Sequence, residues 1–61
     1  MLETEVVGLD KAEAIAKIEA AGLRVRITQE DDQLFPITME LRSDRINLVI
    51  NKGKVTYADR G

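Results

Sequence analysis

The residues best placed to do chemistry lie in one segment, Gln29–Asp44, which carries no helical periodicity of its own. It begins acidic and polar, becomes apolar at Leu34–Ile37, and ends in closely spaced opposite charges over Glu40–Arg45. Loops longer than about 12–15 residues in a small domain are usually functional or disordered. An apolar loop flanked by opposite charges indicates a binding element that ion pairs hold in place.

The composition excludes most catalytic and metal chemistry. The chain has no Cys and no His, which excludes thiol nucleophiles, imidazole bases, zinc fingers and a Ser-His-Asp triad. Carboxylates occur, but no nucleophile and base form a pair, and 61 residues cannot enclose a deep cleft. We therefore expect no enzyme activity, no cofactor and no metal. Calcium at Glu30–Asp32 would need more alternating oxygen ligands, so a solvated turn is favoured there.

Charge and hydropathy limit the kinds of macromolecule or membrane that this chain is expected to bind. Nine Lys and Arg against eleven Asp and Glu give a net charge of −2, and no basic run is present, so we expect neither nucleic-acid nor anionic-membrane binding. No apolar stretch approaches the roughly 18 residues of a membrane span. Glu3 and Glu5 follow Met1 closely, which is unlike a signal peptide. The length predicts one domain, 1–61, and we expect a monomer.

A helix is predicted over Asp10–Ala21. Asp10 is a suitable N-cap, and Glu13 three residues later completes a capping-box pattern. Gly22 is the expected end of the helix because glycine readily adopts positive φ. The apolar side chains share one face of this helix: Ala14, Ile15, Ile18 and Ala21. The narrow stripe of small residues predicts a helix that lies on one face of a sheet.

Alternating apolar and polar residues predict strands over Leu23–Thr28 and Arg45–Asn51. Asn51–Lys54 is a turn, and Val55 and Tyr57 mark a short third strand antiparallel to the second.

The predicted architecture is α+β. A single helix packs on a small mixed sheet, and a long exposed binding loop, Gln29–Asp44, crosses between two parallel strands. Val6–Val7 forms either a short strand or a tucked arm.

The segment Thr38–Arg45, T-M-E-L-R-S-D-R, closely resembles the inhibitory loop of the potato inhibitor I family of serine protease inhibitors, which includes barley chymotrypsin inhibitor and eglin. Val7-Gly8 resembles the opening of that family, and Gly61 matches its C-terminal glycine. Ala20–Arg26 and Arg45–Asn47 look more like a related set of small bacterial inhibitors. The resemblance extends over nearly the whole chain, and the eight-residue loop motif is its specific part.

The resemblance implies a substrate-like inhibitor whose scissile bond is Met39-Glu40. Met39 would be the primary specificity residue, and an apolar, flexible side chain suits a subtilisin- or chymotrypsin-like serine protease. Ile37 and Thr38 would run as an extended strand beside the protease, and Leu41 would occupy the leaving-group side. If the function of the family holds, a secreted or periplasmic location is favoured.

The residues assigned to loop support are Arg42, Arg45, Asn47 and Gly61. In the family, two arginines spaced two apart on the strand after the loop support it, and Arg45 matches the first. The second position is Asn47, which is shorter and uncharged. The bacterial relatives usually carry a Cys near each end, and Arg60 stands where the last would be.

Other interpretations remain open. Asn47, together with a Gln29–Phe35 stretch longer than usual, favours an alternative function: a noncatalytic small binding module of the same fold with weak or no inhibition. Met39 as a buried core residue is the ordinary expectation outside this motif. Arg42, Asp44 and Arg45 could be a plain solvated charge cluster. Phe35 either caps the edge of the core or contacts a partner.

Overall fold

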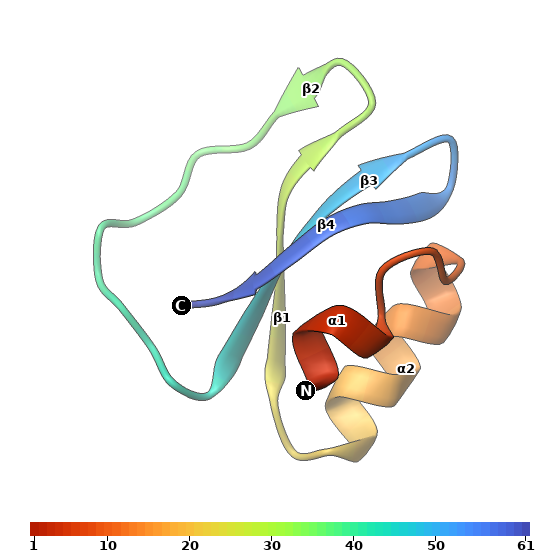
Figure 1. Cartoon of the computed structure of the whole chain (residues 1–61). Coiled ribbons are helices and arrows are strands. Elements are labelled where there is room, and N and C mark those ends of the chain that lie inside the picture. The colour runs from red at the N-terminus through yellow and green to blue at the C-terminus, as the bar shows by residue number, and fades with distance from the viewer.

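Figure 1 shows a computed structural model that describes all residues, 1–61: a twisted sheet with its helices on one side. The elements in chain order are α1 (Leu2–Glu5), α2 (Lys11–Ala20), β1 (Arg24–Glu30), β2 (Gln33–Leu34), β3 (Arg45–Asn51) and β4 (Lys54–Arg60). The four strands form one sheet in the order β2-β1-β3-β4. The α+β fold with a helix on a small mixed sheet is confirmed.

The central strands β1 and β3 are parallel, as predicted, and β3 has the predicted bounds. Strand β4 pairs antiparallel to β3 through a tight turn in which Lys52 and Gly53 both have positive φ, 53° and 79°. Strand β1 ends two residues later than predicted and continues through a turn into β2. The predicted loop Gln29–Asp44 is therefore too long, and the segment without helix or strand is Phe35–Asp44.

The predicted helix is α2, shorter than expected by one residue at each end. Its predicted capping box is wrong, because Asp10 makes no side-chain cap hydrogen bond. The Asp10 carboxylate instead accepts a hydrogen bond from Lys54 Nζ at 2.7 Å. The carboxylate is thus engaged by an ammonium group from a distant part of the chain, in a charge-assisted hydrogen bond, and not by the first turn of its own helix.

The N-terminal residues form α1, which the sequence did not predict. Val6 follows it and is fully buried, so this valine lies in the core without being part of a strand. Beyond it, Gly8 N donates to Val55 O at 2.8 Å, and Val55 N donates to Leu9 O at 2.9 Å. The chain before α2 is thus fastened to the beginning of β4.

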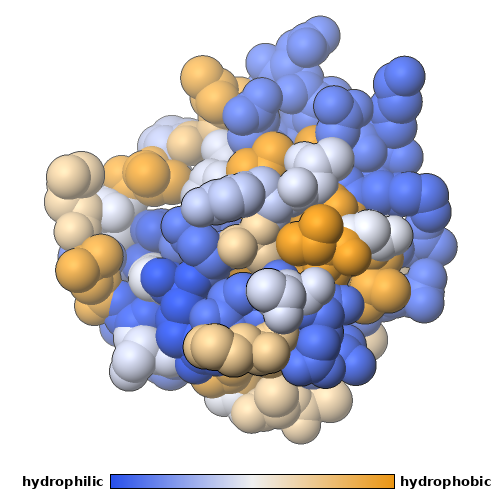
Figure 2. Space-filling view, in the orientation of Figure 1, coloured by the Kyte–Doolittle hydropathy of each residue, from blue (hydrophilic) through white to orange (hydrophobic).

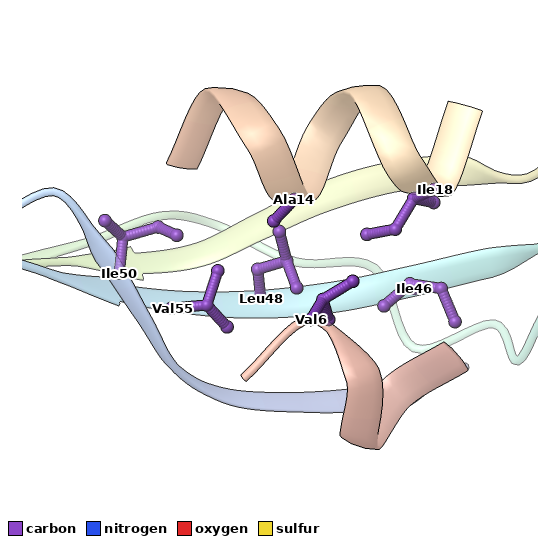
Figure 3. Close-up of a cluster of buried hydrophobic side chains, with 7 residues drawn as sticks. All are labelled: Val6, Ala14, Ile18, Ile46, Leu48, Ile50 and Val55. Carbon is purple, nitrogen blue, oxygen red and sulfur yellow. The ribbon is translucent and has the colours of Figure 1, made fainter. Parts of the chain in front are cut away.

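The core is a cluster of seven buried apolar residues between the helices and the sheet (Figure 3): Val6, Ala14, Ile18, Ile46, Leu48, Ile50 and Val55. Alternation along β3 supplies three of them, so its other face carries Asn47 and Val49. Each fully buried aliphatic side chain contributes about 1.5–3 kcal/mol to folding. This small core, without a disulfide, must support the segment Phe35–Asp44.

The acidic turn around Asp31 is hydrogen-bonded to the end of β3 and to the turn that follows it. Asp31 N donates to Ile50 O at 2.8 Å, and its carboxylate accepts from Lys52 N at 2.7 Å.

No group of three or more His, Cys, Asp or Glu side chains is arranged to hold a metal ion. None of the helices combines the length and the hydropathy needed to cross a membrane.

Candidate functional site

The segment Phe35–Asp44, here called the connecting loop, joins β2 to β3 and extends away from the strands on the side opposite the helices (Figure 1). Phe35 is half-buried, but three other apolar side chains of the loop point into solvent: Ile37 is 52% exposed, Met39 91% and Leu41 90%. Figure 2 shows hydrophobic atoms protruding at the left edge of the molecule, where the loop lies in the same orientation. Met39 is therefore a surface residue and not a core methionine.

Over residues 36–43 the loop makes no backbone–backbone hydrogen bond. The flanking residues do: Phe35 N donates to Thr28 O at 3.1 Å, and Asp44 O accepts from Arg24 N at 2.7 Å. Between these two points the loop stands over an open hollow of about 210 Å³, lined by residues of the loop, β1, β3 and β4. Side chains alone connect the middle of the loop to the sheet.

The first connection comes from Arg45, at the beginning of β3. Its Nη2 donates to the backbone oxygen of Glu40 at 3.2 Å, and Nη1 lies 3.6 Å from the Glu40 carboxylate. Nε donates to Gly61 O at 2.9 Å, which fixes the direction of the guanidinium. Arg45 is only 8% exposed, so these charge-assisted bonds are partly shielded from water. Arg45, which the sequence analysis assigned to loop support, is thus bonded to the loop at Glu40.

The second connection comes from Arg26 on β1, a residue that the sequence analysis did not assign to the site. Its Nη1 donates to Thr38 Oγ1 at 3.2 Å and, more weakly, to Thr38 O at 3.5 Å. Its Nε donates to Asn47 Oδ1 at 2.8 Å. Two sequence signals could have identified Arg26. Alternation along β1 places it on the face away from the helix, and the predicted parallel pairing of β1 with β3 makes Asn47 a candidate neighbour.

Thr38 and Glu40 are also joined to each other. The Thr38 hydroxyl donates to Glu40 Oε1 at 3.1 Å, across the intervening Met39. Since Arg26 binds Thr38 and Arg45 binds Glu40, the two residues that flank Met39 are bonded both to the sheet and to one another. The Met39 side chain itself is left free in solvent.

Asn47 and Gly61 hydrogen-bond to the arginines that hold the loop, and not to the loop itself. Asn47 Nδ2 donates to Asp59 Oδ1 at 3.1 Å and lies 3.4 Å from Gly61 O, so its amide holds Arg26 rather than the loop. A Cβ atom on Gly61 would lie 3.3 Å from Asn47 Nδ2 and 3.9 Å from Leu41 Cδ2. A side chain at position 61 would therefore crowd the amide that orients Arg26.

Arg42 does not bond to the middle of the loop. Its Nε and Nη2 donate to the two carboxylate oxygens of Asp44 at 2.9 and 3.0 Å. This bond lowers the pKa of Asp44 and raises the pKa of Arg42. Arg42 thus stabilises the return of the loop into β3, away from Met39.

Arg60, near the end of β4, is a further residue that the sequence analysis did not assign. Its Nη1 donates to Ser43 O at 3.0 Å, and its Nε and Nη2 donate to the Glu3 carboxylate at 3.3 and 3.1 Å. The hydrogen bond from Arg60 lowers the pKa of Glu3. One guanidinium therefore joins α1 to the end of the loop, and it lies 57 positions along the sequence from the Glu3 that it binds.

Comparison with known protein families, with curated proteins and with solved structures finds no match to this chain.

Proposed function

We propose that this protein inhibits serine proteases by offering the connecting loop as a substrate that is held too firmly to be hydrolysed, with Met39-Glu40 as the scissile bond. One observation carries the proposal. Thr38 and Glu40 are each bonded to an arginine of the sheet, while Met39 between them is 91% exposed. A tethered backbone around a free apolar side chain is what a protease cleft requires of a tight ligand.

The target class follows from the side chains. Met39 is apolar and flexible, so it fits the apolar specificity pocket of a subtilisin- or chymotrypsin-like protease better than a trypsin pocket built for a cation. The backbone groups of Ile37 and Thr38 have no backbone partner within the molecule, and only Thr38 O accepts a weak bond, from Arg26, so they can pair with an edge of the protease. Leu41, also exposed, would contact the leaving-group side.

Resistance to hydrolysis follows from the tethers. Attack by the serine of the protease would leave Met39 joined to that serine as an acyl ester and a new amine on Glu40. Arg26 would still hold the first fragment through Thr38, and Arg45 the second through Glu40. These arginines stand on paired strands, β1 and β3. The new amine would remain beside the acyl group and re-form the peptide bond faster than it could diffuse away.

The direct test is titration of subtilisin and of chymotrypsin with the protein. Inhibition that is complete near one equivalent, with slow cleavage confined to Met39-Glu40, is the expected result. Absence of inhibition with both enzymes would overturn the proposal. Met39→Lys places a cation at the proposed specificity position and should shift inhibition toward trypsin; unchanged selectivity would show that Met39 is not the specificity residue.

A second candidate is a noncatalytic small binding module of the same fold that does not inhibit. It is favoured by the weak contacts on the acyl side of the loop, the part before the Met39-Glu40 bond. There Arg26 donates to the neutral hydroxyl of Thr38 at 3.2 Å and to its carbonyl at 3.5 Å. Asn47 binds Arg26 and does not contact the loop. A weak tether on that side would let the first fragment leave. Rapid and complete cleavage after Met39 in the same titration would favour this candidate.

A further inference from the structure

We propose that the Met39 thioether is a site of reversible oxidation that switches the inhibitory loop off, an inference that rests on the function proposed above. Met39 is 91% exposed, and no polar side-chain contact engages it. Exposed thioethers are oxidised to sulfoxides by peroxides. The chain has no Cys that could react in its place.

Oxidation of Met39 should not change the packing of the rest of the fold. The chain has two methionines, and both Met1 and Met39 lie outside the seven-residue core. There is no disulfide to exchange and no buried sulfur, so oxidation leaves the packing between the helices and the sheet unchanged. The bonds from Arg26 and Arg45 end on residues 38 and 40, so the loop keeps its tethers while the side chain between them changes.

The chemistry is a single oxygen transfer. The oxidant is a hydroperoxide such as hydrogen peroxide: its O–O bond breaks, one oxygen forms an S–O bond with the thioether, and water leaves. Sulfur loses two electrons, and the peroxide gains them. The product is polar and would enter an apolar specificity pocket without a hydrogen-bond partner. Burying such a group unsatisfied weakens binding on the order of 10- to 100-fold.

The test compares inhibition constants for chymotrypsin before oxidation, after complete oxidation by hydrogen peroxide, and after treatment with the two methionine sulfoxide reductases that together reduce both sulfoxide epimers. Peroxide is removed before protease is added, and peptide mass analysis reports the oxidation state of Met39. We expect inhibition to weaken on the order of 10- to 100-fold on oxidation and to return on reduction, with an unchanged circular dichroism spectrum. Undiminished inhibition by fully oxidised protein would overturn the inference and leave the proposed function standing.

The matched variant is Met39→Leu, which replaces the thioether by an apolar side chain of similar volume and retains Met1 as the sole methionine. Whatever its own inhibition constant, the ratio of that constant with and without peroxide treatment should stay near one. An equal loss in this variant would assign the effect to Met1 and overturn the role of Met39. Untreated parent protein that fails to inhibit would overturn the proposed function itself, and this inference with it.

Discussion

Arg26 and Asn47 face each other in register on the parallel strands β1 and β3, and Arg26 Nε donates to Asn47 Oδ1 at 2.8 Å. Position 47 is where the resemblance to potato inhibitor I leads one to expect a second supporting arginine. Here the guanidinium comes from the neighbouring strand, and the shorter amide at position 47 orients it. Arg26, on β1, supplies the positive charge that reaches Thr38 in this molecule.

Replacing Arg26 by alanine should loosen the acyl side of the loop. The bond to Thr38 is lost, and because it is exposed to water it is worth only about 0.5–1.5 kcal/mol although its donor is charged, so we expect inhibition of chymotrypsin to weaken roughly 2- to 10-fold. Hydrolysis of Met39-Glu40 should accelerate, because the first fragment can leave. Inhibition constants and mass spectrometry of the cleaved loop measure both effects.

Arg24→Ala is the matched control for that change, because Arg24 is an exposed arginine of the same strand that pairs with Asp44 and not with Thr38. Its loop should be cleaved no faster than that of the parent. A second comparison introduces Asn47→Arg into the Arg26→Ala protein. If Arg26 only stabilises the sheet, the double variant should be cleaved as fast as Arg26→Ala. If the guanidinium acts on the loop, the double variant should be cleaved more slowly than Arg26→Ala.

Arg45→Ala should affect both the loop and the fold. Arg45 is 8% exposed and donates to Glu40 O and to Gly61 O, and hydrogen bonds from charged groups are worth about 1.5–3 kcal/mol each. Because water can reach the freed acceptors, we expect a loss of about 2–3 kcal/mol of stability in urea unfolding, together with conversion of inhibitor into substrate. Arg45→Lys retains the charge but cannot donate to both oxygens in the same geometry, so it should fall in between. A long-lived protease complex with Arg45→Ala would contradict this role.

The sequence predicted those features that depend on neighbours along the chain. Alternation alone located β3 at Arg45–Asn51, and helical spacing located α2 to within one residue at each end. It missed features set by pairing between distant segments. Arg26 meets Asn47 because β1 pairs with β3 in this register, and the Asp10 carboxylate meets Lys54 at the beginning of β4, 44 residues away in sequence.

The same limit explains α1. Leu2–Glu5 is too short to be stable as an isolated helix, so its own residues give no signal for it. It persists where Glu3 binds Arg60 and where Val6 enters the core. Arg42, which the motif assigned to loop support, makes its hydrogen bonds within the loop, to the carboxylate of Asp44 two residues on, and not to Thr38 or Glu40.

Leu48→Ala should nearly abolish the folded state. Leu48 is fully buried at the centre of the core, and removing such a side chain costs about 2–5 kcal/mol. That is a large fraction of the few kcal/mol that a domain of this size possesses. Urea unfolding followed by circular dichroism measures the loss. Leu34→Ala, at a position 75% exposed on β2, is the matched control and should change stability by less than about 0.5 kcal/mol. Equal losses would contradict the assignment of the core.

Stability should fall in acid, and Asp44 should account for a separable part of the fall. Hydrogen bonds lower the pKa values of Glu3, Asp10 and Asp44 in the folded protein, from Arg60, Lys54 and Arg42 respectively. The unfolded chain therefore binds protons at a higher pH than the folded chain. The stabilisation by these carboxylates is complete above their unfolded pKa values and is lost as the pH falls through the lower folded values.

Urea unfolding of the parent and of Asp44→Asn, from about pH 7 to about pH 2, isolates this contribution. The variant should be the less stable protein near neutrality, because Arg42 loses its charged partner. The difference between the two should shrink as the pH falls, since protonation removes the same charge from the parent. Asp32→Asn makes the same substitution at an exposed aspartate that forms no ion pair, and its curve should follow that of the parent throughout. A constant difference between parent and Asp44→Asn down to the lowest pH would show that the Arg42–Asp44 pair contributes nothing through its charge.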